Sequence, residues 1–198
     1  MAATVAGQRQ ILAYTSSALV ALLPTGETLW TKPWHMTVAQ PVIVPPDRIF
    51  VSTTQVAGST FEGGSELFRI SFAEGKAQVE TVWESREMRN YWSGSVAHDG
   101  YLYGFDNATL RCVSLETGES KWARRGLGKG SLILADGLLI LWSDQAVLTL
   151  AEATPEGYQQ KGQVQVFDVG RTWAPPALAD GRLFLRGGPH LACFDVKG

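Results

Sequence analysis

The stretch from Ser93 to Trp122, SGSVAHDGYLYGFDNATLRCVSLETGESKW, decides the fold. It places Asp99-Gly100 between a short apolar run and the alternating segment Tyr101–Phe105. Asp-Gly between alternating apolar runs favours a tight hairpin turn, because these residues tolerate the positive φ that such a turn requires. A third apolar run leads into Thr117-Gly118-Glu119, where glycine again suits a tight turn, and a last segment closes the unit. The stretch predicts four antiparallel strands.

The same unit recurs along the chain. Asp-Gly followed by an apolar run returns at Asp136 and Asp180, and Asp47 begins the same element without its glycine. Thr25-Gly26-Glu27-x-x-Trp30 repeats the ending of the unit. The spacings between successive turn aspartates are 52, 37 and 44 residues, which is the period of propeller blades. We predict an all-β protein, a β-propeller of about five four-stranded antiparallel blades, over residues 3–34, 40–84, 92–123, 129–169 and 173–198.

The two ends of the chain leave ring closure open. A meander with two apolar faces is stable only when neighbouring blades cover both. The last unit has no segment for a fourth strand, and the first unit has only Ala3–Ala6 as its first strand. The chain is therefore either a small closed ring or an incomplete part of a larger seven- or eight-bladed propeller. An open arc would expose apolar blade faces, which favours a protein partner or self-association.

The composition and charge of the chain indicate which classes of partner are not expected. The chain has 198 residues, is 45% hydrophobic, contains 21 glycines and carries a formal net charge of −2. With no basic block, nucleic acid is not expected as a partner. No apolar run has the length of a membrane span. The first residues do not resemble a signal peptide, so we expect the chain to stay where it is made.

The two cysteines occupy one slot of the repeat. Cys112 follows Asp99 by 13 residues, and Cys193 follows Asp180 by 13. The unit at Asp136 lies between these two units, so the cysteines should be much farther apart than the roughly 7 Å between Cα atoms that a disulfide tolerates. We expect both to be reduced, small, buried hydrophobic residues.

These motifs together resemble a known family. The repeat Ala-Asp-Gly-x-Leu, then Leu-x-Cys, then Thr-Gly-Glu-x-x-Trp is similar to the pyrroloquinoline-quinone-like (PQQ-like, quinoprotein-type) β-propeller repeat. The segments 88–90, 99–105, 125–131, 150–158 and 173–178 resemble the C-terminal half of bacterial, planctomycete-type members, and the resemblance runs from about Arg9 to Gly198. It implies a seven- or eight-bladed propeller that is exported to the periplasm or cell envelope.

The resemblance raises the question of a quinone cofactor. Quinoprotein dehydrogenases hold the quinone in the channel, stacked on tryptophan and bound to calcium through Glu, Asn and Asp. This sequence has no adjacent cysteine pair and no Asp/Glu/Asn cluster with ligand spacing. We therefore expect no cofactor. Trp30, Trp83 and Trp122 lie at outer-strand positions of the repeat, and we expect them to pack between blades.

Other catalytic patterns are missing from the sequence. His35, His98 and His190 occupy different slots of the repeat, which argues against a metal site. Gly-x-Ser-x-Gly is absent. Gly126-x-Gly128-x-Gly130 opens a strand rather than a helix, so it lacks the helix N-terminus that holds phosphate. We expect a non-catalytic protein.

Equivalent positions of the repeat, counted from the turn aspartates, predict a candidate ligand site at the channel mouth. Residues that enter each innermost strand lie about seven positions before the turn aspartate, and propeller loops commonly carry function. The candidate ligand-binding residues are Gln40, Trp92, Lys129 and Trp173, with Asn90 and Arg171 two positions earlier. Indoles beside cationic groups would suit a peptide, a glycan or an aromatic ligand. The alternative is that the tryptophans wedge between blades.

Two connections between the apolar runs stand out in the sequence. Thr53–Ser65 is rich in Gly, Ser and Thr and predicts an exposed hairpin tip, while Trp83–Trp92 predicts a surface connection between blades.

The function favoured by the sequence is a non-catalytic PQQ-like repeat propeller that acts as a protein-interaction scaffold. The alternatives are a fragment of a quinoprotein-type oxidoreductase and a glycan-binding module of the cell envelope.

Overall fold

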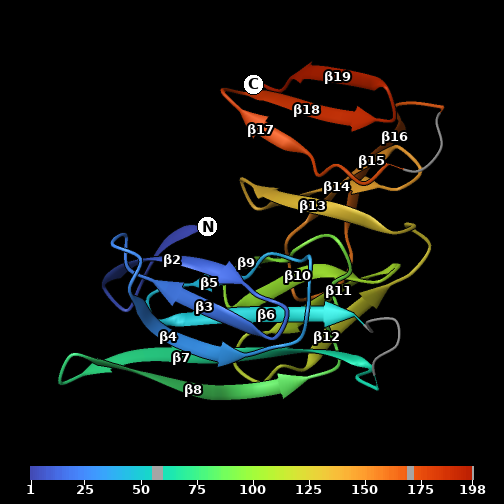
Figure 1. Ribbon diagram of the computed structural model, residues 1–198. Helices are drawn as coiled ribbons and strands as arrows, with labels where there is room; N and C mark the ends of the chain where they lie inside the picture. Colours follow the sequence, from blue (N-terminus) through green and yellow to red (C-terminus); the bar gives the residue numbers. More distant parts are fainter. Residues whose placement is uncertain (55–59, 169–171, 198) are drawn as a thin grey trace.

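The computed structural model describes residues 1–54, 60–168 and 172–197, and in this part of the chain the strands form five antiparallel meanders (Figure 1). We number these sheets as blades 1 to 5. Blade 1 contains β1 (Ala2–Val5), β2 (Gln8–Tyr14), β3 (Ala18–Leu22) and β4 (Thr28–Pro33). Blade 2 contains β5 (Val42–Val44), β6 (Arg48–Thr54), β7 (Gly63–Ala73) and β8 (Lys76–Ser85).

Blades 3 to 5 continue the order. Blade 3 contains β9 (Val96–His98), β10 (Tyr101–Asp106), β11 (Thr109–Ser114) and β12 (Ser120–Arg124). Blade 4 contains β13 (Gly130–Ala135), β14 (Leu138–Ser143), β15 (Val147–Glu152) and β16 (Gln160–Gln165). Blade 5 contains β17 (Ala177–Ala179), β18 (Arg182–Gly187) and β19 (His190–Asp195). The exposed hairpin tip expected at Thr53–Ser65 is wrong at its ends, because Thr53 and Ser65 are buried and paired in β6 and β7; its residues 55–59 lie outside the described residues.

In blades 1, 3, 4 and 5 the first hairpin depends on a turn with two residues at positive φ. Asp99 and Gly100 have φ values of 45° and 85°, and the Asp-Gly pairs of blades 4 and 5 have the same signs. This backbone matches the twist of the flanking strands, and glycine adopts it without steric cost. Blade 1 makes the same turn with Ala6 and Gly7, at 50° and 77°, which the Asp-Gly pattern does not reveal.

The second and third strands of each blade supply both of its apolar faces. In blade 3, Leu102 pairs with Val113 and packs toward blade 2, while the next pair, Tyr103 and Cys112, packs toward blade 4. All four side chains are fully buried. Successive residues of a strand point to opposite faces, so neighbouring pairs face opposite ways. We call the pair toward the preceding blade the rear pair and the pair toward the following blade the front pair.

The same two pairs recur through the chain. The rear pairs of blades 2 to 5 are Ile49–Phe68, Leu102–Val113, Leu139–Ala151 and Leu183–Phe194. The front pairs of blades 1 to 4 are Leu12–Ala21, Phe50–Leu67, Tyr103–Cys112 and Ile140–Leu150. Four apolar clusters result, each joining one blade to the next. The hydrophobic core is therefore a series of interfaces between neighbouring blades.

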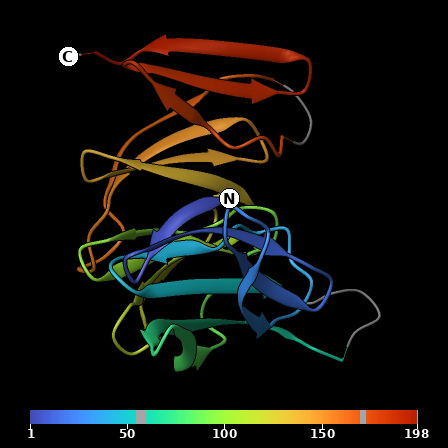
Figure 2. The same ribbon diagram turned by 60° about the vertical axis from the view of Figure 1, so that its left-hand side comes forward.

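The series does not close on itself. Among the described residues, no blade packs on the rear pair of blade 1, Ile11 and Leu22, and Ile11 is 39% exposed. In the same part of the chain no blade follows the front pair of blade 5, Phe184 and Cys193, and Cys193 is exposed. Figures 1 and 2 show the last sheet (red) separated from the first (blue) in both views. The protein is an all-β, incomplete propeller, and of the two arrangements expected from the sequence the small closed ring is wrong.

The open end also corrects one cysteine prediction. Cys112 is buried and free, as expected, because blade 4 covers it. Cys193 is free but exposed, although it occupies the same slot in blade 5. The expectation that both are buried is wrong for Cys193, because blade 5 has neither a fourth strand nor a following blade in the described residues.

No helix in the described residues is long and apolar enough to span a bilayer.

The rear pairs predict a clear difference in stability between two variants. Leu102→Ala should lower the free energy of unfolding by about 3 kcal/mol, because it leaves a cavity between blades 2 and 3. Ile11→Ala, at the equivalent position of blade 1, should change it by less than about 1 kcal/mol, because Ile11 is already partly in solvent. Urea denaturation of both variants measures this. Equal losses would contradict the assignment of rear pairs.

Candidate functional site

The inner strands of the arc border a cavity of about 770 Å³. Its walls come from β5, β9 and β13, the first strands of blades 2, 3 and 4. Most lining side chains are aliphatic, and the polar ones include the hydroxyls of Ser93, Ser95 and Ser131. The described lining contains no acidic or basic side chain. This is the inner channel side of the incomplete propeller, where the sequence predicts the mouth.

Three of the six predicted site residues line this cavity, namely Gln40, Trp92 and Trp173. The two indoles stack, with ring centroids 5.0 Å apart and planes 15° from parallel. Trp92 enters blade 3 and Trp173 enters blade 5, so the contact spans blade 4. Trp173 remains 53% exposed, while Trp92 is half-buried and its Nε1 finds no partner among the described residues.

Lys129 joins the same group from the entry to blade 4. Its Nζ lies 5.7 Å from the ring centroid of Trp92 and 5.0 Å from that of Tyr91. An ammonium over an aromatic face is attracted by the negative potential of the ring. Four predicted residues from the entries to four blades therefore converge on one rim.

Asn90 lies differently from that rim group. It is 1% exposed; its Nδ2 donates to the carbonyl of Phe105 at 3.1 Å, and its Oδ1 accepts from Ser95 Oγ at 3.0 Å. The Asn90 backbone N–H donates to Ser52 Oγ at 2.8 Å. Its polar groups are thus satisfied inside the protein, where they tie blade 2 to blade 3. The sixth residue, Arg171, lies outside the described residues.

The connection Trp83–Trp92 is more buried than the sequence predicts. Met88 is fully buried, so a surface connection is the wrong description for this part of the segment. Arg89 holds the nearly buried Asp106 through two hydrogen bonds of 2.9 and 3.2 Å. This hydrogen bonding raises the pKa of Arg89. Arg89 and Glu87, which pairs with Arg111, therefore bind blade 3, whereas Arg86 remains exposed and pairs with Glu62.

The outer-strand tryptophans pack on the following blade, as predicted. Trp30 lies edge-on to Phe68 of blade 2 at 5.9 Å between ring centroids. Trp83 Nε1 donates to the carbonyl of Leu115 at 3.0 Å, and Trp122 Nε1 donates to that of Thr154 at 2.8 Å. The N–H groups of Trp83 and Trp122 therefore bridge two blades, whereas Trp30 Nε1 donates to Gln10 Oε1 of its own blade at 2.8 Å and Trp30 contacts blade 2 through its ring.

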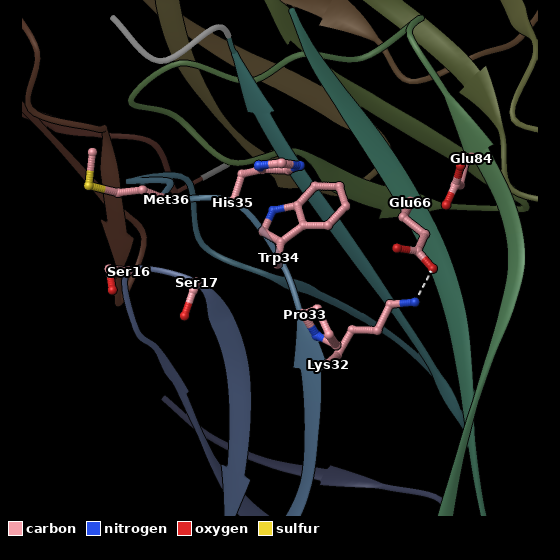
Figure 3. Close-up of a pocket in the computed structure, with 9 residues that line it drawn as sticks. All are labelled: Ser16, Ser17, Lys32, Pro33, Trp34, His35, Met36, Glu66 and Glu84. Atoms are coloured by element: carbon pink, nitrogen blue, oxygen red, sulfur yellow. Dashed lines mark ion pairs between the residues drawn. The ribbon is translucent and has the colours of Figure 1, made fainter. Parts of the chain in front are cut away.

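A second pocket, of about 580 Å³, lies at the junction of blades 1 and 2 (Figure 3). Lys32 of β4 places Nζ 2.6 Å from Oε1 of Glu66 in β7, and the Glu66 side chain is 3% exposed. Thr81 Oγ1 of β8 donates to the same oxygen at 2.5 Å. The ion pair therefore links the outer strand of blade 1 to blade 2. Sequence reasoning missed it, since the only signal was one acidic residue within the apolar run of β7.

Trp34, His35 and Glu84 also line this pocket. Figure 3 shows Trp34 and His35 beside the strands that carry Glu66 and Glu84. Glu84 is directly opposite Glu66 in the register of β7 and β8. His35 stacks on Phe61 with ring centroids 3.6 Å apart. Among the described residues no group of three or more His, Cys, Asp or Glu side chains could hold a metal ion.

Comparisons with known proteins agree on the fold. No family profile matches the sequence, and neither does any curated protein. Among solved structures, the chain is similar to BamB from Moraxella catarrhalis (TM-score 0.63, 12% identity, 94% of this chain and 57% of that one). It is also similar to Sqt1 from Saccharomyces cerevisiae (TM-score 0.75, 11% identity, 98% and 59%).

Both neighbours are β-propellers, so the fold of this protein belongs to the β-propeller class. A protein of unknown function from Bacteroides caccae is also similar (TM-score 0.58, 15% identity, 92% and 68%). The chain spans less than two thirds of BamB and of Sqt1, which agrees with the open arc.

The ion pair between blades 1 and 2 gives a stability prediction. Lys32→Ala should lower the free energy of unfolding by about 2 kcal/mol, because it leaves the buried Glu66 carboxylate unpaired. Glu84→Gln, in the same pocket but exposed, should stay within about 0.5 kcal/mol. The double variant Lys32→Met/Glu66→Leu should recover most of the loss, because both buried charges are replaced. Thermal and urea unfolding measure all three. No recovery would show that the pair is not the cause.

The cysteines give a labelling prediction. Burial raises the pKa of the Cys112 thiol to about 11, so at pH 8 it is both covered and almost entirely protonated. Since the thiolate is the reactive form, iodoacetamide should label Cys193 alone in the folded protein and both residues in urea. Intact mass and peptide mapping measure this. Labelling of Cys112 in the native state would contradict the packing of blades 3 and 4.

Proposed function

We propose that this protein is a PQQ-like repeat propeller that acts as a non-catalytic protein-binding module. The supporting observation is the rim formed by Gln40, Trp92, Lys129 and Trp173 beside the inner cavity. The turn and strand pattern of the repeat supports the assignment to the PQQ-like group.

The chemistry of the rim suits a peptide. Trp173 offers a half-exposed indole whose ring is held in place by the stack with Trp92. Buried aromatic anchors supply much of the energy of protein interfaces, and a pre-positioned ring loses little entropy on binding. The aliphatic cavity and its serine hydroxyls can receive an apolar side chain and bond to the peptide backbone. We infer that the partner presents an extended segment with one large apolar residue.

Glycan binding is the second candidate, because the exposed face of Trp173 could stack against a sugar ring. The two functions differ in how binding depends on the cavity. A peptide uses both the indole and the cavity behind it, whereas a sugar needs only the indole face.

A display experiment tests the proposal. Random peptides selected against the full chain should bind at least about tenfold more weakly to Trp173→Ala, because the anchoring indole is lost. Met36→Ala, also on an exposed side chain but in the other pocket, should bind like the parent. Fluorescence titration with oligosaccharides should leave the tryptophan emission unchanged. No peptide enrichment, or saturable quenching by a sugar, would overturn the protein-binding function in favour of other ligands.

A dye-reduction assay tests whether the protein is a quinoprotein-type oxidoreductase. With added pyrroloquinoline quinone and Ca²⁺, the protein should not reduce an artificial electron acceptor in the presence of alcohols or sugars. Dye reduction that depends on both protein and quinone would show that the oxidoreductase alternative is correct.

A further inference from the structure

The outer edge of β19 has an unpaired backbone. In blades 1 to 4 the third strand pairs on both sides, whereas β19 pairs with β18 alone in the described residues. The N–H of Val196 donates to the carbonyl of Gly181 on the β18 side. Bonding directions alternate along an antiparallel strand, so the N–H and C=O groups of Leu191, Cys193 and Asp195 face the free edge.

The sequence of β19 does not protect this edge. The true outer strands carry cations or proline that discourage further pairing, namely Lys32 and Pro33 in β4, Lys76 in β8, Lys121 and Arg124 in β12 and Lys161 in β16. β19 has no Lys, Arg or Pro. Leu191, Phe194 and the adjacent Val196 are 70%, 38% and 50% exposed. The strand therefore has the composition of an interior strand with one side uncovered.

The chain itself shows what covers such a strand. In blade 3, β12 pairs with β11 and places Trp122 directly opposite Cys112. The same geometry pairs Trp30 with Ala21 in blade 1 and Trp83 with Leu67 in blade 2. Three of the four complete blades therefore use a tryptophan opposite the third-strand member of the front pair.

Blade 5 contains a front pair like the one that Trp122 covers in blade 3. β11 and β19 share the pattern Leu-x-Cys, at 110–112 and at 191–193. In blade 3 the ring of Trp122 lies 6.1 Å from that of Tyr103, the other member of the front pair. Phe184 takes the place of Tyr103 in blade 5 and is cross-strand to Cys193. An indole on a fourth strand would cover both Phe184 and Cys193.

We propose that β19 binds an extended segment of a partner polypeptide, which pairs antiparallel as the fourth strand of blade 5 and places a tryptophan over Phe184 and Cys193. Backbone hydrogen bonds to Leu191, Cys193 and Asp195 supply affinity, and the indole supplies specificity, as in other cases of strand addition. This surface lies on the outer edge of blade 5 and is separate from the rim at Trp173, so it extends the proposed function to a second contact.

The occupant is a different polypeptide rather than a second copy. The strands that carry a suitable tryptophan, β4, β8 and β12, are each already paired within their own blade. A second copy would have to release one of them and expose the indole that joins two of its own blades. A partner segment with an unpaired strand of this kind has no such cost.

A peptide taken from β12 serves as the probe. The peptide GESKWARR copies residues 118–125, and its matched control replaces the tryptophan by alanine. The readout is the rate at which iodoacetamide labels Cys193 in the full chain. At a peptide concentration ten times its Kd the rate should fall about tenfold, since only unbound protein reacts. The alanine peptide should protect far less at the same concentration.

A chain variant locates the binding site. Leu191→Pro removes an N–H that faces the free edge and leaves the β18 pairing intact, so its unfolding temperature should match the parent. Peptide protection should be lost in this variant but kept in Trp173→Ala, which separates this proposal from the function of the rim.

Three results would overturn the proposal. They are no protection of Cys193 at millimolar peptide, equal protection by the alanine peptide, and protection that persists in Leu191→Pro. Light scattering of the chain alone gives a further check. A mass twice that of the chain that falls to one chain in Leu191→Pro would show that a second copy covers the edge instead.

Discussion

The pleat of the β-strand is the constraint on which this architecture depends. Within one hairpin, two consecutive cross-strand pairs face opposite ways, so the rear pair serves one interface and the front pair serves the next. A slip of one residue in the register would exchange the two pairs and turn apolar groups away from their partners. The tight Asp-Gly turn fixes the register of the first hairpin in blades 3 to 5, while the second hairpin, which carries the two pairs, has its own turn, at Asn107 (φ 55°) in blade 3. The pairing of the third strand with the fourth is irregular in blades 1 to 4. In each of them its register shifts at the same place, between the third-strand residue of the front pair and that of the rear pair.

Much of this could be predicted from the sequence, because the signals are local and repeated. Turn aspartates, strand alternation and the Thr-Gly-Glu-x-x-Trp ending are all determined within about 30 residues of each other. The exceptions depend on contacts across blades. Met88 and Asn90 are buried because Ser52 and Phe105 lie against their connection. Lys32 and Glu66 meet only once blades 1 and 2 have packed. Cys193 has the sequence of a buried residue, but exposure depends on what covers a strand.

The candidate site shows the same division between local and long-range information. Counting back from the turn aspartates correctly indicates which residues enter the inner strands, and the fold brings four of these entries to one rim. Counting positions does not show which of these side chains form hydrogen bonds inside the protein and are therefore not free to bind a ligand. Asn90 differs from Trp92 by two positions, yet one binds the neighbouring blade and the other borders the cavity. Arg171 lies outside the described residues and stays a prediction.

The stack of Trp92 on Trp173 has a mechanical consequence. In a series of blades that contact only their neighbours, each interface behaves as a separate joint, and the angles at successive joints can vary independently. The indole pair joins the entries to blades 3 and 5, so it bridges two joints at once. Opening either joint pulls the rings apart, and the two angles become coupled. The curvature of this half of the arc is therefore a shared property of three blades, set by a clasp on the concave side.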